Sequence, residues 1–440
     1  MTSATTPAIL GGSPVRSTPY PTANTIGEME RRLVNQVLDT GVLSGYIAHH
    51  GAAFNGGPMV AAFEEEMCRT FGSEYAVSCN SATSGLQMSV AAALAGLGDE
   101  VIVPPYTMSA TASVVAATNA TPIFADIRPD TFCIDPDDVR RKLSSRTRAI
   151  IAVNLFGGPA DLLTLRQLAD ERQIMLIEDN AQAPGGRIGA RNTGTVGHMA
   201  VFSFNCHKTM QCGEGGVVVT DDAVLADRLR LVRNHGDVVL SQRPEVPDEL
   251  HGLIGFNFRL TELQSAVALA QLRRLEELTV GRIDVADALT AGLRGVEGLT
   301  PPWRAPENRH VYYLYAMRVD SGRLGLSRAQ LKTALDAERV PVAEGYVRPI
   351  YLHPMFHERV AHRRTGFGAG IWHPAPDSPA RYRPGLCPVT EQMHFQEVLT
   401  TNICRADLTI GAASDFVRAV EKVVSHRTEV RAALEARGVH

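Results

Sequence analysis

A single lysine, Lys208, lies in a polar stretch between two apolar runs, where an amine is well placed to do chemistry. The runs cover residues 199–204 and 217–220, and a glycine-rich turn at 213–216 precedes the second run. This pattern predicts a strand, an exposed loop and a second strand. An amine held on such a loop could form a Schiff base with an aldehyde cofactor, although most loop lysines are simply solvated.

A carboxylate is the second candidate. Asp179 ends the apolar run 174–179, where it would be buried and would need a cationic partner. A protonated pyridine nitrogen is such a partner. Capping of the next turn explains Asp179 equally well when this residue is considered alone.

Hydroxyl and aromatic residues extend the set. The stretch 81–85, SATSG, opens a helix that we expect at 84–95, and helix N-termini bind phosphate through free N–H groups and the helix dipole. An ordinary serine or threonine N-cap would have the same sequence. Tyr106 follows Val-Pro-Pro and could stack on a flat ring, although a core tyrosine is the commoner case.

Five short apolar runs, with helical patterns between most of them, determine the expected fold. They lie at 75–79, 101–104, 122–126, 148–154 and 174–178. Strands that are apolar throughout and alternate with helices indicate a mostly parallel sheet covered on both faces, which is a three-layer α/β fold. Ligands bind beyond the carboxyl ends of such strands, so the polar residues there are the candidate site.

The pattern also predicts how the chain divides. We expect an extended arm at 1–25, a large domain at 26–270 and a smaller C-terminal α/β domain at 271–440, with an irregular loop at 353–386. Loops of that length usually carry function or are disordered. In the smaller domain we expect strands at 311–319 and 340–342 and helices at 327–338 and 414–436.

Composition restricts the partners. The 440 residues are 45% hydrophobic and carry a net charge of −4, which gives no basic footprint for nucleic acid or an anionic membrane. The seven cysteines are scattered, odd in number and without metal-ligand spacing, so we expect reduced thiols and no metal site. No export signal and no apolar run of about 18 residues occur, which predicts a cytoplasmic protein.

Four motifs in order resemble one family. They are IEDNAQAPGG (177–186), FSFNCHKTMQCGEGG (202–216), LVRNHG (231–236) and GFNFRLTELQSA (255–266). With them the chain resembles the DegT/DnrJ/StrS family of sugar and cyclitol aminotransferases, which depend on pyridoxal 5'-phosphate. The resemblance runs from about residue 10 to the C-terminus, and it implies the aspartate aminotransferase fold, fold type I.

The resemblance implies a role for each candidate. Lys208 would hold the cofactor and move the substrate proton, and Asp179 would pair with the ring nitrogen. The other implied cofactor contacts are Gln182 near the phenolic oxygen, Ala82, Thr83 and Ser203 at the phosphate, Tyr106 against the ring, and Asn257 at the phosphate of a neighbouring subunit. Asn257 therefore implies a homodimer with shared active sites.

The implied reaction moves an amino group from glutamate or glutamine to a keto-sugar or keto-cyclitol, as in antibiotic biosynthesis. Arg348, His353 and Arg363 could bind acceptor hydroxyls or phosphates, and a solvated cluster explains them equally well. Two alternatives remain. One is a dehydratase of the same family, in which a histidine replaces the lysine, and here His207 precedes a retained Lys208. The other is a non-catalytic regulatory protein that binds the cofactor.

Overall fold

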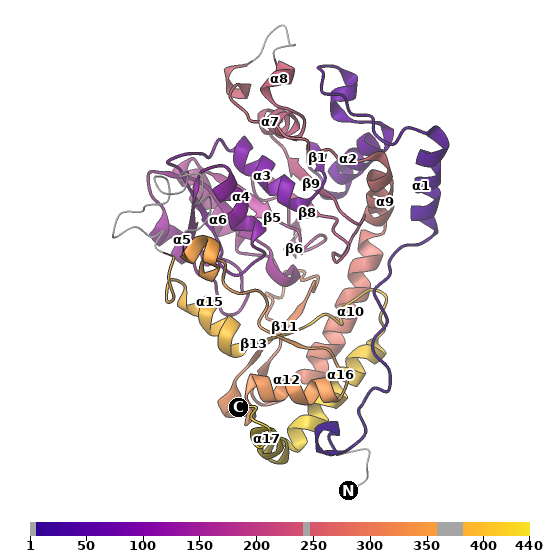
Figure 1. Cartoon of the computed structure of the whole chain (residues 1–440), viewed down its shortest axis with the longest axis vertical. Coiled ribbons are helices and arrows are strands. Elements are labelled where there is room, and N and C mark those ends of the chain that lie inside the picture. The colour runs from indigo at the N-terminus through magenta and orange to yellow at the C-terminus, as the bar shows by residue number, and fades with distance from the viewer. Residues whose placement is uncertain (1–5, 241–246, 359–381) are drawn as a thin grey trace.

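A seven-stranded sheet lies at the centre of the larger part of the molecule (Figure 1). The computed structural model describes residues 6–240, 247–358 and 382–440. The strand order is β1-β9-β8-β5-β4-β2-β3. The strands are β1 (Tyr75–Cys79), β2 (Glu100–Val103), β3 (Thr121–Phe124), β4 (Thr147–Val153), β5 (Met175–Asp179), β8 (Met199–Ser203) and β9 (Gly216–Thr220).

The sheet is parallel except at β9. β9 runs antiparallel to both of its neighbours, β1 and β8, whereas β8, β5, β4, β2 and β3 run parallel to one another. A loop, 204–215, joins β8 directly to β9, and such a connection returns the chain antiparallel. The mostly parallel α/β sheet expected from the sequence is confirmed.

Alternate residues of β8 and β9 face two different helical layers. Val201 and Val218 pack in a cluster with helices α3, α4, α6 and α7, whereas Phe202 and Val217 pack with α1, α2 and α9. This alternation follows from the two-residue period of a strand and gives the three layers. The helices are α1 (Glu28–Thr40), α2 (Pro58–Phe71), α3 (Ala82–Ala92), α4 (Ala110–Ala117), α5 (Pro136–Lys142), α6 (Leu162–Arg172), α7 (Ala223–Arg233) and α9 (Glu262–Arg273).

A smaller antiparallel sheet has the order β10-β11-β13-β12 and packs against α10 (Leu275–Leu293), α12 (Arg328–Ala337) and α16 (Ile410–Ser425). Its strands are β10 (Leu299–Thr300), β11 (Tyr315–Val319), β12 (Ala343–Glu344) and β13 (Val398–Thr401). The division into domains at residue 270 stays a prediction. Residues 350–356 pack with the core of the large sheet although they follow β12 in the chain.

Three local expectations were wrong. The strand expected at 311–319 begins only at Tyr315, because Tyr312 has a φ of 49° that no strand accommodates. The strand expected at 340–342 lies instead at 343–344. The helix expected at 414–436 is two helices, α16 and α17 (Arg427–Glu435), which meet at His426.

The N-terminal arm is bound to the smaller, C-terminal part of the molecule, at Glu338 (Figure 1). The buried carboxylate of Glu338 accepts hydrogen bonds from the backbone N–H of Ala8 at 2.7 Å and of Val15 at 2.8 Å. The same carboxylate pairs with Lys422 of α16 at 2.9 Å. The charge pair and the two N–H donors satisfy a carboxylate that is otherwise costly to bury.

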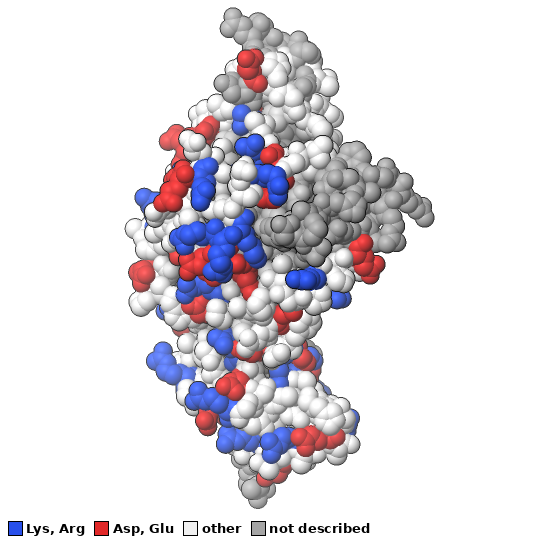
Figure 2. Space-filling view, turned by 90° about the vertical axis from the view of Figure 1, so that its left-hand side faces the viewer, with Lys and Arg blue, Asp and Glu red and all other residues white. Residues whose placement is uncertain are grey.

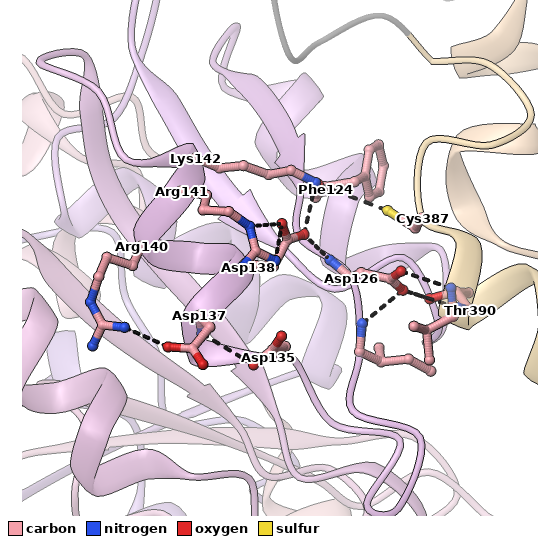
Figure 3. Close-up of polar contacts among 12 residues, drawn as sticks. Phe124, Asp126, Asp135, Asp137, Asp138, Arg140, Arg141, Lys142, Cys387 and Thr390 are labelled. Atoms are coloured by element: carbon pink, nitrogen blue, oxygen red, sulfur yellow. Dashed lines mark hydrogen bonds and ion pairs between the residues drawn. The ribbon is translucent and has the colours of Figure 1, made fainter.

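A buried aspartate fixes the C-terminal segment to the edge of the large sheet (Figure 3). Asp126, just after β3, accepts from the N–H of Val389 and Thr390 at 2.9 Å and from the Thr390 hydroxyl at 2.7 Å. These bonds satisfy the first turn of α15 (Pro388–Gln392). Asp138 in turn accepts from the Asp126 N–H at 2.6 Å.

On the face shown in Figure 2, basic and acidic side chains lie interleaved rather than in blocks of one sign. Pairs of opposite charge within α5, such as Arg140 with Asp137 and Arg141 with Asp138, are of the same kind. Among the residues that the structure describes, no helix is both long enough and apolar enough to cross a membrane.

The contribution of Asp126 to stability can be measured. We expect Asp126→Ala to lower the free energy of unfolding by about 2 kcal/mol, because it leaves buried N–H groups of α15 unpaired. Asp137→Ala, which removes an exposed pair on α5, should change it by no more than about 0.5 kcal/mol. Urea denaturation of both variants gives the comparison, and equal effects would contradict the role of Asp126.

Candidate active site

The strand register brings the candidate residues to one edge of the sheet. Cys79 and Ser203 both pair with Gly216, and Asp179 pairs with Val201, two residues before Ser203. The ends of β1, β5 and β8 and the start of β9 therefore lie together. This is the edge at which α/β proteins bind ligands.

The N-terminus of α3 forms an anion cradle at this edge. The Ser81 hydroxyl caps the helix by accepting from the Ser84 N–H at 3.1 Å, which leaves the N–H groups of Ala82 and Thr83 directed out of the first turn. Gly216 passes so closely that a Cβ there would lie 2.5–2.7 Å from the backbone of Ser81 and Ala82. Only glycine allows that approach.

Ser203 lies beside the cradle. It is buried at the end of β8, and its hydroxyl accepts from the Asn205 N–H at 3.3 Å. Its backbone pairs with Gly216, which touches Ser81. The structure thus brings Ala82, Thr83 and Ser203 together, as the sequence predicts for a phosphate site.

Lys208 lies in the loop between β8 and β9, as predicted, but it is half-buried rather than exposed. The loop folds back on itself through hydrogen bonds from the Cys206 N–H to the Gly213 oxygen and from the Cys212 N–H to the Phe204 oxygen. The Lys208 ammonium lies 4.6 Å from the ring centroid of Tyr313. This ring, from a segment far along the chain, covers the lysine.

The two acids that end β5 are both buried but differ in their partners. The carboxylate of Glu178 accepts from the N–H of Gly194, Val196 and Gly197, at 2.6–2.7 Å. Among the described residues, the Asp179 carboxylate accepts only from the Ala181 N–H, at 3.2 Å, and the Thr111 hydroxyl, at 3.3 Å. Glu178 is therefore a structural acid, and Asp179 retains the capacity to bind a cation.

Asp179 and Lys208 influence each other's charge. Burial raises the pKa of Asp179, and the nearby Lys208 acts in the opposite direction. Burial also lowers the pKa of Lys208, and Asp179 partly restores it. A lysine with a lowered pKa presents a larger fraction of neutral amine, which is the form that acts as a nucleophile or base.

Gln182 is engaged within the protein. Its side-chain oxygen accepts from the Phe156 N–H at 2.8 Å, and its amide nitrogen donates to the Tyr346 hydroxyl at 3.0 Å. Phe156 has a φ of 58°, an uncommon value for a residue other than glycine, and this bond helps to hold it. One amide hydrogen of Gln182 remains for a cofactor, so its expected donor role stays a prediction.

Tyr106 is fully buried in a group of aromatic rings. Phe156, Tyr346 and His394 approach it edge-on, with ring centroids 6.3, 6.2 and 5.8 Å away. Its hydroxyl has no well-aligned partner among the described residues, the Tyr346 N–H being a nearby donor. His394 belongs to a turn of π-helix, η6 (Met393–Glu397), a geometry that often marks functional sites.

Several of these residues were not predicted. Thr111, Phe156, Tyr313, Tyr346 and His394 come from loops, a helix and the C-terminal segment, and none has a distinctive sequence pattern. Tyr346 has the only signal, because it lies two residues before the expected acceptor residue Arg348 in the stretch 346–351, YVRPIY. The Ile350 N–H donates to the Pro105 oxygen, which brings this stretch beside Tyr106.

The structure describes two of the three expected acceptor residues, Arg348 and His353. Arg348 is exposed, and burial, Arg328 and Arg348 together lower the pKa of the His394 imidazole to about 4. His353 ends the short helix η5 (Ile350–Leu352) and makes no described side-chain contact with the site. Arg363, like most of the expected loop 353–386, lies outside the described residues.

Asn257 makes no described side-chain contact with the cradle of its own chain, although the next residue, Phe258, accepts a backbone hydrogen bond from Asn80 at 2.9 Å. The Asn257 backbone pairs with Asn234, and its exposed side chain has no hydrogen-bond partner among the described residues. The Arg259 guanidinium donates to the side-chain oxygen of Asn234 at 2.7 Å, which helps to fix the turn that presents Asn257.

Comparison with known proteins identifies the family. Residues 43–369 match the model of the DegT/DnrJ/EryC1/StrS aminotransferase family. The chain belongs to this family. It is therefore a pyridoxal-phosphate-dependent aminotransferase of the sugar and aminocyclitol group, with fold type I.

Two curated relatives and one solved structure illustrate the match. L-glutamine:2-deoxy-scyllo-inosose aminotransferase of Streptomyces kanamyceticus is 32% identical, and the alignment covers 97% of this chain and 98% of the relative. dTDP-3-amino-3,4,6-trideoxy-alpha-D-glucose transaminase of Streptomyces venezuelae is 36% identical over 68% of this chain and 76% of the relative. The aminotransferase of Psychrobacter cryohalolentis superposes with a TM-score of 0.78, at 26% identity, over 93% of this chain and 99% of its own.

The residues of this aminotransferase fit the cofactor. The α3 N-terminus, with Gly216 against it, forms an anion cradle. Asp179 is a buried carboxylate with few partners, as a protonated ring nitrogen requires, and Lys208 is a half-buried amine with a lowered pKa. Together they match the phosphate, ring nitrogen and aldehyde of pyridoxal phosphate.

The coupling between Asp179 and Lys208 predicts a shift in pH dependence. The cofactor-free protein should capture pyridoxal phosphate faster as pH rises through the pKa of Lys208, because only the neutral amine reacts. Asp179→Asn removes the charge that raises this pKa, so the inflexion should move to lower pH. Borohydride trapping at a series of pH values measures it, with Asp137→Asn as the surface control. An inflexion that stays in place or rises would contradict the coupling.

Proposed function

We propose that this aminotransferase transfers the amino group of L-glutamine to the ketone of a cyclitol, in the biosynthesis of an aminocyclitol antibiotic. The relative from Streptomyces kanamyceticus supports the acceptor and donor classes, because that alignment spans nearly the whole of both chains. The arrangement that carries the transamination itself is Lys208, with its lowered pKa, beside the incompletely satisfied Asp179. The retained lysine favours amino transfer over the dehydratase alternative.

In this proposal each residue has a defined task. The neutral amine of Lys208 takes the proton from the amino-bearing carbon of the donor and returns it on the acceptor side. Asp179 keeps the ring nitrogen protonated through charge pairing, and bound pyridoxal phosphate then supplies the electron sink. Tyr106 stacks on the ring.

The remaining contacts hold the cofactor. The N–H groups of Ala82 and Thr83 and the Ser203 hydroxyl bind the phosphate. The free amide hydrogen of Gln182 donates to the phenolic oxygen.

The acceptor would bind on the side of Tyr106, Tyr346 and His394. A cyclitol presents hydroxyl groups and no charge, so hydroxyl and imidazole groups, with Arg348 and His353 at the rim, suit it. Burial and the nearby arginines lower the pKa of His394 to about 4. The imidazole is therefore neutral near pH 7 and can both donate and accept a hydrogen bond.

A homodimer belongs to the proposal. Several exposed apolar side chains lie on segments that hydrogen bonds connect to the turn of Asn257: the Asn234 amide donates to the Ile47 oxygen, and the Phe256 N–H donates to the Val232 oxygen. The exposed apolar residues are Val42, Leu43, Ile47, Val238, Ile254 and Phe256. Exposed apolar side chains on these segments suit burial against a second copy of the chain, whose phosphate site Asn257 would then reach.

Absorbance spectroscopy tests the reaction. We expect the holoenzyme to lose its visible band when L-glutamine is added and to regain it when a keto-cyclitol follows. Lys208→Ala should abolish the visible band of the bound cofactor and reduce turnover by at least about 10³-fold. Recovery with a nucleotide-linked keto-sugar but with no keto-cyclitol would overturn the proposed acceptor, and an unresponsive wild-type spectrum would overturn the reaction.

Complementation tests the shared site. If Asn257 acts on the partner's cofactor, mixing Asn257→Asp with Lys208→Ala subunits should restore activity that neither variant has alone. A heterodimer then contains one complete site, so an equal mixture should reach about a quarter of wild-type activity. Two different affinity tags on the two variants, and recovery of protein that carries both, confirm that heterodimers have formed. No recovery in a mixture shown to contain heterodimers would mean that Asn257 serves its own subunit or none.

A further inference from the structure

Lys208 also lines a pocket of about 630 Å³ on the side of the N-terminal arm. Parts of the chain that are distant in sequence form its wall: the arm at 22–25, the lysine loop, α10, Tyr313 and the segment 402–407 that follows β13. The pocket is large enough for an amino acid. The cofactor residues described above leave it unassigned, apart from Lys208 itself.

One buried cation in this pocket lacks a carboxylate. Arg282 of α10 is only 8% exposed, and one terminal nitrogen donates to the Tyr312 oxygen at 3.3 Å and to the Cys404 oxygen at 2.5 Å. None of the described carboxylates forms an ion pair with it, although Asp407 lies close enough to act on its charge. Burial lowers the pKa of this guanidinium, which nevertheless stays protonated in a protein.

The other cations of the pocket have carboxylates nearby. Arg405 donates to both carboxylate oxygens of Asp407, at 2.9 and 2.7 Å, and also to the Pro21 oxygen. Lys208 is close enough to Asp179 for that carboxylate to act on its charge. Arg282 is thus a buried guanidinium without an ion pair among the described residues, and a buried charge without a counterion is costly unless a ligand supplies one.

Tyr313 connects this charge with the reactive amine. Its ring lies under the Lys208 ammonium, with 4.6 Å between the nitrogen and the ring centroid. Arg282 is close enough to Tyr313 to act on the pKa of its phenol, in the direction opposite to burial. The guanidinium and the amine thus both lie near Tyr313 and line the same pocket.

We propose that the Arg282 guanidinium binds a carboxylate of the amino-acid donor and so positions its amino group toward Lys208. The inference rests on the proposed transamination and adds the donor site to it. A guanidinium can bind a carboxylate through two parallel hydrogen bonds, which fixes orientation as well as charge. An uncharged cyclitol has no need of a buried cation, so Arg282 distinguishes the donor from the acceptor.

The contact is tested by replacing Arg282 and by removing the donor carboxylate, separately and together. Single-turnover rates are measured for wild type and Arg282→Gln with L-glutamine and with L-glutaminol, in which an alcohol replaces the carboxylate. We expect Arg282→Gln to lower kcat/KM for L-glutamine about 100-fold and to change that for L-glutaminol less than about threefold. L-glutamate is the third donor, because it has a side-chain carboxylate that L-glutamine lacks. A large loss of kcat/KM with L-glutamate alone would assign the contact to that carboxylate.

Equal losses with all three donors would overturn the proposal, since Arg282 would then act only through Tyr312 and Cys404. Arg309→Gln is the matched control, because Arg309 pairs with Glu276 outside the pocket. If Arg282→Gln does not fold, Arg282→Lys retains a charge but not the two-pronged geometry. Arg282→Lys should then lower kcat/KM for L-glutamine more than kcat/KM for L-glutaminol. Equal losses of kcat/KM with the two donors would again reject the contact. A wild-type enzyme that reacts with none of the donors would refute the transamination itself, a distinguishable failure.

Discussion

A carboxylate buried with too few hydrogen bonds is the constraint on which the site depends. Asp179 has two weak donors, whereas its neighbour Glu178 has three short backbone ones. The protein therefore tolerates Asp179 only where positive charge is at hand, and the strand register places Lys208 and the α3 N-terminus at the same edge. Pyridoxal phosphate would satisfy the acid through its ring nitrogen and the cradle through its phosphate.

Much of the central sheet could be predicted, because strands that are buried on both faces have continuous apolar sequences. The same apolar pattern predicted the positions of Lys208, Asp179 and the start of a helix near Ser81, because each of them lies at the end of such a run or within a few residues of it. It failed at Tyr312, where a left-handed backbone interrupts a run that reads as a strand. It could not find Thr111 or Tyr313, because tertiary packing and not local pattern brings them to the site.

Gln182 was predicted as a cofactor contact, but the structure shows that it also has a structural role. Its position near Asp179 indicated a cofactor contact, yet its amide first holds Phe156 at a positive φ and reaches Tyr346. Phe156 and Tyr346 both touch Tyr106, so this one amide determines how three rings pack. A sequence pattern records the residue but not the strain that it supports.

The anchoring of the N-terminal arm also affects how the chain is made. Ala8 and Val15 precede their acceptor, Glu338, by more than 300 positions, and Lys422, which completes that site, lies later still. Arg16 likewise pairs with Asp415. The strands of the large sheet all precede Glu338, so during synthesis the arm stays unattached until the smaller sheet and its helices have followed.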